Sequence, residues 1–231
     1  HTFLGWKALF NAGAGVDAFL KLGLHINCPL IRLEDAGMAE QMCEYISQGV
    51  LTHFRDFDLY AVKQRNALWE REEPRKKADF PIGILGLGVL GQKVASDMRA
   101  RGFPVHAWTR SQRDAPAGIP LFHGAHGLDQ FLAATQILIC LLPLTHETEG
   151  ILNAQNLHKL RHEAYVINVA RGAHVIDDDL IAAIDDGHIA GALLDVFREE
   201  PLSPTHPFWH HRAIRVTPHI SAATLRSESV K

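Results

Sequence analysis

The stretch from Pro81 to Ser96 constrains the fold of this chain more than any other, because it reads as a buried strand, a glycine turn and a helix. An apolar run over residues 82–85 is followed by apolar side chains at helical spacing. In that context, Gly86-x-Gly88-x-x-Gly91 is typical of a turn that binds a dinucleotide. Gly86 would form the tight turn, Gly88 would let a pyrophosphate approach the backbone, and Gly91 would let helix and strand pack closely.

The start of this helix is the second part of the expected nucleotide site. Its first residues, Val89 and Leu90, would turn unpaired backbone N–H groups and the positive end of the helix dipole toward the phosphates. A glycine turn with a purely structural role is the alternative interpretation of the same pattern.

The end of the next expected strand bears on which dinucleotide binds. In such sites an acidic residue about 20 residues after the glycines holds the ribose 2′-hydroxyl of NAD. Here the chain reads Thr109-Arg110-Ser111-Gln112-Arg113, without a carboxylate. Two guanidinium groups with two hydroxyls suit a 2′-phosphate, since Arg offers a charged, bidentate fork. We therefore predict NADP(H) as the preferred cofactor, with NAD(H) as the alternative. The other interpretation is a solvated loop with ordinary surface arginines.

Composition excludes several classes of protein. The 231 residues are 47% hydrophobic and 21% charged, as in a soluble globular protein. A net charge of −3 gives no general attraction to nucleic acid or to an anionic membrane. The longest apolar run, residues 137–142, is too short to span a bilayer. Cys28, Cys43 and Cys140 lack metal-ligand spacing and are odd in number, so we expect no metal site, no disulfide framework and a reducing, cytoplasmic compartment.

Short apolar runs alternate with helical patterns after residue 80, which predicts an α/β fold with a doubly wound parallel sheet of the Rossmann type. Strands are expected near residues 82–85, 104–108, 136–142, 164–169, 190–196 and 213–217. A helix is expected from Asp177, with its acidic first turn, to a stop at Gly187.

Two domains are expected. Residues 1–35 read as the C-terminal part of an incomplete substrate domain, and residues 36–231 as a dinucleotide-binding domain. The second includes a long helix crossing between the domains, because apolar residues recur at helical spacing from Met38 to Phe57. Residues 70–77 read as a solvated linker. The chain begins with His and ends soon after residue 219, so we expect truncation at both ends.

Ligands of such sheets bind outside the carboxyl ends of the strands, so the residues just past each strand are the first candidates for chemistry. They lie in segments 142–148, 168–172, 195–201 and 217–219. Together they bring arginine, carboxylate and histidine side chains to the same side of the sheet. That set fits hydride transfer to a 2-oxo acid.

Four motifs resemble the D-isomer-specific 2-hydroxyacid dehydrogenase family in order and spacing: Gly86-x-Gly-x-x-Gly91, Asn168-Val-Ala-Arg-Gly172, Leu194-Asp-Val-Phe-x-x-Glu-Pro201 and Thr217-Pro-His219. Ala12-Gly-Ala-Gly-Val-Asp17, Arg32-Leu-Glu-Asp-Ala-Gly-Met38 and the Arg110 loop are similar, more narrowly, to its glyoxylate/hydroxypyruvate reductase A branch. The resemblance implies NADPH-dependent reduction of glyoxylate to glycolate or of hydroxypyruvate to D-glycerate. It also implies a flavodoxin-like substrate domain, of which residues 1–35 would be a remnant.

The same resemblance assigns residue roles. Arg171 would bind the substrate carboxylate and polarise its ketone, and His219 would donate the proton as general acid. Glu200 would accept a hydrogen bond from the other imidazole nitrogen and keep the acid charged. Ala14 and Gly15 would give backbone N–H groups to the substrate. The expected cofactor-binding residues are Gly86, Gly88, Val89, Leu90, Gly91, Thr109, Arg110, Ser111, Arg113, Leu142, Pro143, Val169, Ala170 and, in a supporting role near the nicotinamide, Asp195.

Two alternatives to this function stay open at the level of sequence. One is a non-catalytic NAD(P)-sensing module of the same fold, because such relatives can keep Arg171, Glu200 and His219. The other is a reductase of a different 2-oxo acid. The expected partners are a small 2-oxo or 2-hydroxy acid and a second copy of the chain, since the long helix before the linker suits a two-fold interface, with no nucleic acid and no membrane.

Overall fold

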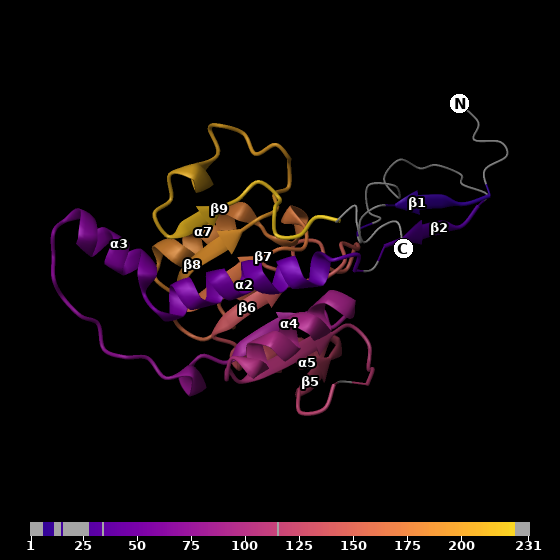
Figure 1. The fold of residues 1–231 in the computed structure, drawn as a ribbon, viewed down its shortest axis with the longest axis horizontal. Helices are drawn as coiled ribbons and strands as arrows, with labels where there is room; N and C mark the ends of the chain where they lie inside the picture. Colours follow the sequence, from indigo (N-terminus) through magenta and orange to yellow (C-terminus); the bar gives the residue numbers. More distant parts are fainter. Residues whose placement is uncertain (1–6, 12–14, 16–27, 34, 115, 225–231) are drawn as a thin grey trace.

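Most of the chain is built around one seven-stranded parallel sheet in the computed structural model, which describes residues 7–11, 15, 28–33, 35–114 and 116–224 (Figure 1). The strand order is β5-β4-β3-β6-β7-β8-β9. The order reverses between β3 and β6, which is the point where doubly wound sheets bind ligands. The strands are β3 (Ile82–Leu85), β4 (Val105–Thr109), β5 (Leu121–His123), β6 (Ile137–Cys140), β7 (Ala164–Asn168), β8 (Ile189–Leu194) and β9 (Ile214–Val216).

The predicted doubly wound sheet is confirmed. All six expected strands occur, and their ends differ from the expected ones by two residues at most. β5 was missed because it is a three-residue edge strand without a buried side chain, so it leaves no apolar run in the sequence.

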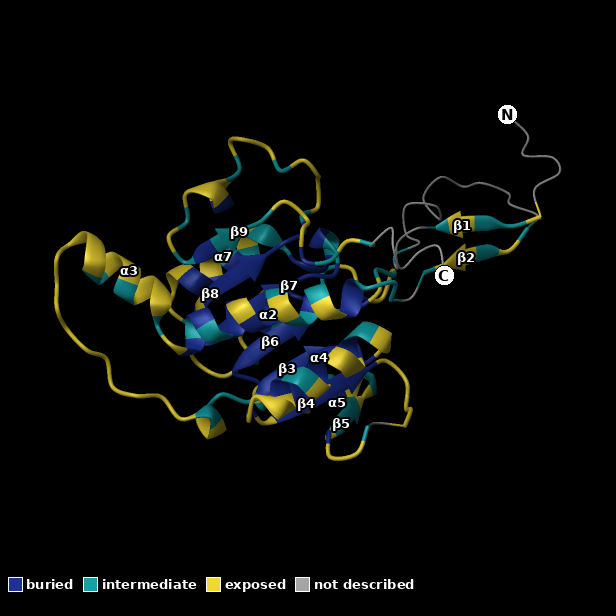
Figure 2. Cartoon of the chain, viewed as in Figure 1, coloured by how far each residue is buried: buried dark blue, intermediate teal, exposed yellow. Residues whose placement is uncertain are grey.

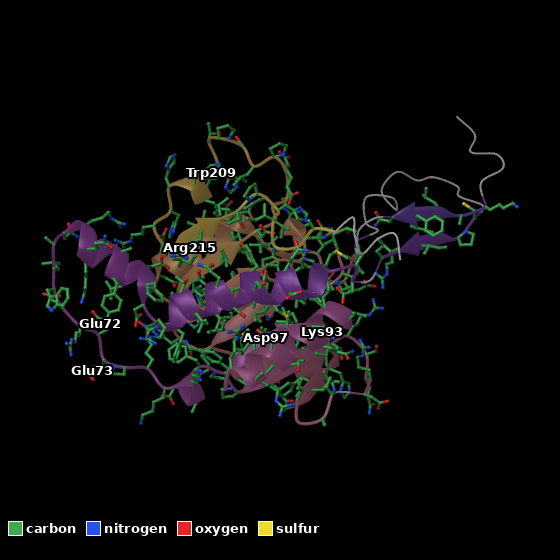
Figure 3. The ribbon with its side chains drawn as sticks, in the orientation of Figure 1. Glu72, Glu73, Lys93, Asp97, Trp209 and Arg215 are labelled. Carbon is green, nitrogen blue, oxygen red and sulfur yellow. The ribbon has the colours of Figure 1, made fainter. Side chains whose placement is uncertain are left out.

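Helices cover both faces of the sheet. α2 (Met38–Phe54) and α4 (Val89–Ala100) pack on one face, while α5 (Gly124–Ala133), α6 (Ala154–Leu157) and α7 (Asp177–Asp185) pack on the other. The inner strands β3, β4, β6 and β7 are buried on both faces (Figure 2), which explains their apolar character. Between the helices of the first face, Ser47 Oγ of α2 donates a hydrogen bond to Asp97 Oδ2 of α4 (2.9 Å), whose position Figure 3 labels.

The helix expected to run to Phe57 ends earlier. α2 stops at Phe54, Asp56 turns with φ 56°, and Phe57 begins α3 (Phe57–Arg65). Asp tolerates this left-handed conformation better than most residues, and its carboxylate lies 2.6 Å from the guanidinium of Arg75. The prediction of one helix through Phe57 was therefore wrong, because helical spacing continues across a turn that the sequence pattern does not reveal.

The N-terminal part forms a separate sheet. β1 (Leu9–Asn11) and β2 (Leu30–Arg32) pair in parallel and lie apart from the seven-stranded sheet in Figure 1. Between α3 and the short 3₁₀ helix η1 (Lys77–Asp79), residues 70–76 form neither helix nor strand, as expected for a linker. The division into domains 1–35 and 36–231 stays a prediction.

Within the described residues, no helix combines the length and apolar character needed to cross a bilayer. The same residues contain no group of three or more His, Cys, Asp or Glu side chains placed to hold a metal ion. Cys28, Cys43 and Cys140 are free thiols.

Candidate functional site

A pocket of about 640 Å³ lies at the carboxyl ends of the central strands. Its walls come from the loops after β3, β4, β6, β7 and β9, from the first turns of α2, and from the N-terminal part. The predicted site residues that line it are Gly15, Gly86, Gly88, Val89, Leu90, Gly91, Thr109, Arg110, Ser111, Arg113, Leu142, Pro143, Val169, Ala170, Arg171 and His219. Glu200 and Asp195 are not among the residues that line it, and Ala14 lies outside the described residues.

The three glycines of the β3–α4 turn differ in what surrounds them. Gly86 has φ 100°, a conformation that L side chains rarely adopt. A Cβ on Gly91 would lie 2.1 Å from the carbonyl oxygen of Gly86, so helix and strand could not approach this closely with any other residue. A Cβ on Gly88 would meet nothing within 4 Å, although Gly88 lines the pocket. The open space in front of Gly88 fits the approach of a pyrophosphate to the backbone.

The first turn of α4 faces this open space. Gly88 is the N-cap of the helix and no side chain caps it, so the first N–H groups of the helix are not satisfied by a capping side chain. Such a helix start attracts phosphate through its N–H groups and its dipole. The chain's own residues therefore fit a dinucleotide at this turn.

The end of β4 presents the two predicted arginines to the pocket. The Thr109 hydroxyl donates to the Ser111 carbonyl (2.9 Å) and tightens the turn before Arg113. Arg110 lies 3.5 Å from the Glu147 carboxylate, but both side chains are mostly exposed. Because exposed ion pairs are weak, Arg110 can exchange this partner for another anion.

The end of β7 holds Arg171 in place through a buried asparagine. Asn168 is fully buried, its amide nitrogen donates to the Arg171 carbonyl (2.9 Å) and its amide oxygen accepts from the Ala170 N–H (3.2 Å). A Cβ on Gly172 would lie 1.8 Å from the Phe197 carbonyl carbon, so the turn can continue only through glycine. The local sequence thus fixes the backbone that presents Arg171 at the pocket.

The imidazole of His219 is paired with a carboxylate. His219 Nδ1 lies 2.8 Å from Glu200 Oε2, and Glu200 Oε1 accepts from the Phe197 N–H (2.9 Å). Since a carboxylate only accepts, Nδ1 carries the proton in this hydrogen bond. Arg171 and His219 line one and the same pocket, as the proposed chemistry requires.

Asp195 was expected near the nicotinamide, but it does not line the pocket. It is fully buried, and its carboxylate accepts three hydrogen bonds from the segment after β9: from Thr217 Oγ1 and from the N–H groups of Ile220 and Ser221. Through these hydrogen bonds, Asp195 fixes the position of the loop that carries His219.

Several lining residues were missed at the level of sequence. Met38 and Met42 belong to the apolar face expected from helical spacing; they are 5% exposed and also line the pocket. Helical periodicity identifies a buried face but does not tell which end of that face meets a ligand. The other missed lining residues are Arg32, Leu87, Leu141, Leu144, Thr145, Thr148, Ser221, Ala222 and Thr224.

A doubly wound sheet with a glycine turn at its switch point, together with an arginine and a carboxylate-paired histidine at one pocket, defines the class of dinucleotide-dependent dehydrogenases. Comparison with known proteins agrees. The family model described as D-isomer specific 2-hydroxyacid dehydrogenase, NAD binding domain, matches residues 48–221.

Solved structures give the same result. A D-isomer specific 2-hydroxyacid dehydrogenase from Xanthobacter autotrophicus Py2, solved with NADPH and MES, is 41% identical with a TM-score of 0.92, and the match covers 96% of this chain and 70% of that one. The NADPH-dependent glyoxylate/hydroxypyruvate reductase from Sinorhizobium meliloti, solved with NADP and sulfate, is 38% identical with a TM-score of 0.90. The match covers 94% of this chain and 70% of that one. The chain therefore belongs to the D-isomer-specific 2-hydroxyacid dehydrogenase family, which confirms the predicted resemblance and enzyme class.

Proposed function

We propose that the protein reduces a small 2-oxo acid with NADPH, and that glyoxylate and hydroxypyruvate are its substrates. One observation carries the proposal: Arg171 and the Glu200-paired His219 line the pocket that also contains the open glycine turn. The Sinorhizobium meliloti relative, which is named a glyoxylate/hydroxypyruvate reductase, supports the choice of substrates.

The residues at the ends of β3 and β4 would hold the cofactor. Gly88 and the start of α4 suit the pyrophosphate, while Arg110 and Arg113 suit a 2′-phosphate. Two relatives were solved with NADPH or NADP bound, which supports NADP(H) over NAD(H). When bound, this cofactor supplies the hydride.

The residues at the ends of β7 and β9 would bind the acid and move the proton. Arg171 offers a planar fork of donors to the substrate carboxylate and polarises the adjacent ketone, and Gly15 supplies a backbone N–H. His219 Nε2 donates the proton to the ketone oxygen as the alcohol forms. Glu200 accepts the hydrogen bond from Nδ1, which keeps the ring oriented.

The proton donor is tested with His219→Ala. We expect turnover of glyoxylate and hydroxypyruvate, followed by the absorbance of NADPH, to fall by about 10²–10⁴-fold, because one acid/base group contributes about that much. NADPH binding, measured by fluorescence titration, should persist. His210→Ala is the control, since His210 is an exposed histidine outside the pocket lining.

Two outcomes of this experiment would refute the proposal. Near-normal turnover by His219→Ala would refute the assignment of His219 as the general acid. A wild-type protein that binds NADPH but reduces no small 2-oxo acid would support the non-catalytic sensing module instead.

We further propose a homodimer that works in a reducing cytoplasm. The support for a dimer is the exposed apolar surface of α3 and the residues after it, which include Phe57, Leu59, Val62, Leu68 and Trp69. The support for the compartment is that the three cysteines are free thiols.

A further inference from the structure

The segment from Thr217 to Thr224 carries His219 but contains no helix or strand of its own. The backbone of His219 has φ 56°, a left-handed conformation that is strained for a residue other than glycine. Its side chain is 44% exposed, so burial does not fix it. The segment therefore depends on specific hydrogen bonds for its position, and several of its side-chain partners, Gln41 and Tyr45 among them, lie on α2.

Tyr45 of α2 connects to the segment through Thr217. Thr217 Oγ1 lies 2.5 Å from Tyr45 Oη and 2.6 Å from Asp195 Oδ1. Because a carboxylate only accepts, the Thr217 proton goes to Asp195, and Tyr45 must donate to Thr217. Burial raises the pKa of Tyr45 to about 12, so the phenol keeps the proton that this bond needs.

Asp195 extends this connection to the other side of His219. Its carboxylate accepts from the N–H groups of Ile220 (2.8 Å) and Ser221 (2.7 Å), and its carbonyl oxygen accepts from the N–H of His219 (2.8 Å). The chain of donors from Tyr45 therefore ends at the Asp195 carboxylate, which also accepts from the two residues that follow His219.

Gln41 holds the far end of the segment. Its amide nitrogen donates to the Ala223 carbonyl (2.7 Å) and its amide oxygen accepts from the Ala223 N–H (3.2 Å). Gln41 and Tyr45 are four residues apart, so they share one face of α2. One helical face thus contacts the segment on both sides of His219.

We infer that Gln41 and Tyr45, together named the α2 clamp, are positioning residues that keep His219 at the pocket. The inference rests on the proposed role of His219 as the acid. Neither residue of the clamp is part of the pocket lining; they act through the segment that they hold. A displacement of about 1 Å at a reacting group can cost about 10²-fold in rate, so a loose segment would lower turnover even with every reacting group present.

The test removes the donor and keeps the helix. In Tyr45→Phe we expect kcat to fall about tenfold or more, while KM for NADPH stays near the wild-type value, because the glycine turn is untouched. Thr217→Val should reproduce this loss and Thr217→Ser should restore activity, since only Ser keeps the hydroxyl. Tyr60→Phe is the matched control, because it removes a hydroxyl that accepts from the N–H of the linker residue Glu72 rather than contacting the segment.

Gln41→Leu tests the second half of the clamp, with Gln48→Leu as control. Gln48 is on the same helix but bonds Thr52 within α2 rather than the segment. Hydrogen exchange gives a readout apart from activity: the N–H groups of Ile220 and Ser221 should exchange faster in Tyr45→Phe, and that of Ala223 in Gln41→Leu.

A double-mutant cycle with His219→Gln decides whether the clamp acts through the imidazole. If it does, Tyr45→Phe lowers kcat in the wild type but causes no further loss in the His219→Gln background. An equal loss in both backgrounds would overturn the inference, and so would wild-type kcat with unchanged exchange in Tyr45→Phe. If His219→Gln alone keeps full turnover, the proposed acid fails; faster exchange at Ile220 and Ser221 would then still support the clamp, and unchanged exchange would overturn it.

Discussion

Arg110 illustrates how a single side chain can decide which cofactor binds. It lines the pocket, and its partner Glu147 is exposed and 3.5 Å away, a weak contact in water. A 2′-phosphate would offer Arg110 a stronger, bidentate partner. An uncharged 2′-hydroxyl would not, so the preference between the two cofactors should depend on this guanidinium.

For Arg110→Asp we expect KM for NADPH to rise about 10- to 100-fold, because a charged hydrogen bond is worth about 1.5–3 kcal/mol. KM for NADH should change much less. Steady-state kinetics with both cofactors measure the two effects, and Arg212→Asp, an exposed arginine outside the pocket lining, controls for the change of charge. Equal effects on both cofactors would refute the assignment of Arg110.

Single residues were predicted well where backbone position alone determines the contact. Arg171 and His219 reach one pocket because the carboxyl ends of parallel strands share an edge, a rule that needs no coordinates. The connection from Tyr45 through Thr217 to Asp195 could not be predicted. It joins residues far apart in sequence through hydroxyl groups that carry no pattern of their own.

At the level of elements, the β3–α4 turn separates two requirements that the sequence motif combines. Gly91 is required by the fold itself, since a Cβ at this position would collide with the Gly86 backbone. Gly88 is surrounded by open space and is required only by what approaches it. Substitution of Gly91 should therefore lower stability as well as NADPH binding, whereas substitution of Gly88 should mainly lower NADPH binding.

For Gly91→Ala we expect a loss of about 1–3 kcal/mol in the free energy of unfolding, as is usual for overpacking, together with weaker NADPH binding. Gly88→Ala should lose much less stability and still bind NADPH poorly. Urea unfolding and fluorescence titration measure the two quantities. Equal destabilisation by both substitutions would contradict this separation.

Secondary structure was predictable where burial leaves a pattern. The inner strands of the sheet are buried and leave apolar runs, so they were found, whereas the three-residue edge strand β5 and the turn at Asp56 were not. The turn joins two helices whose apolar spacing stays in phase. The ion pair that stabilises this turn joins Asp56 to Arg75, which lies in the linker after α3.

In the molecule as a whole, α3 lies outside the core. The helix has no buried residue, and the side chain of Trp69 beyond it is 94% exposed. A concentration of exposed apolar side chains of this kind usually marks an interaction site. A second copy of the chain is the partner that we propose.

Sedimentation velocity tests the dimer. The wild type should sediment as a dimer, and Val62→Glu combined with Trp69→Ser should sediment as a folded monomer, because charge is placed on the apolar surface while the core is untouched. Trp209→Ser, an exposed tryptophan on η3 (Pro207–Trp209), is the control and should remain dimeric. A wild-type monomer at all concentrations would exclude this assembly.

The parallel sheet has a consequence for how such an enzyme can diversify. Because the neighbouring strands run in the same direction, each strand is joined to the next by a crossover connection that packs on one face of the sheet. The loops at the pocket are therefore separated from one another along the chain. Beyond Pro143, the loop after β6 can gain or lose residues without shifting the register of any strand or the loop after β9. Substrate range can therefore change one loop at a time, while the residues proposed to bind the cofactor and donate the proton stay the same.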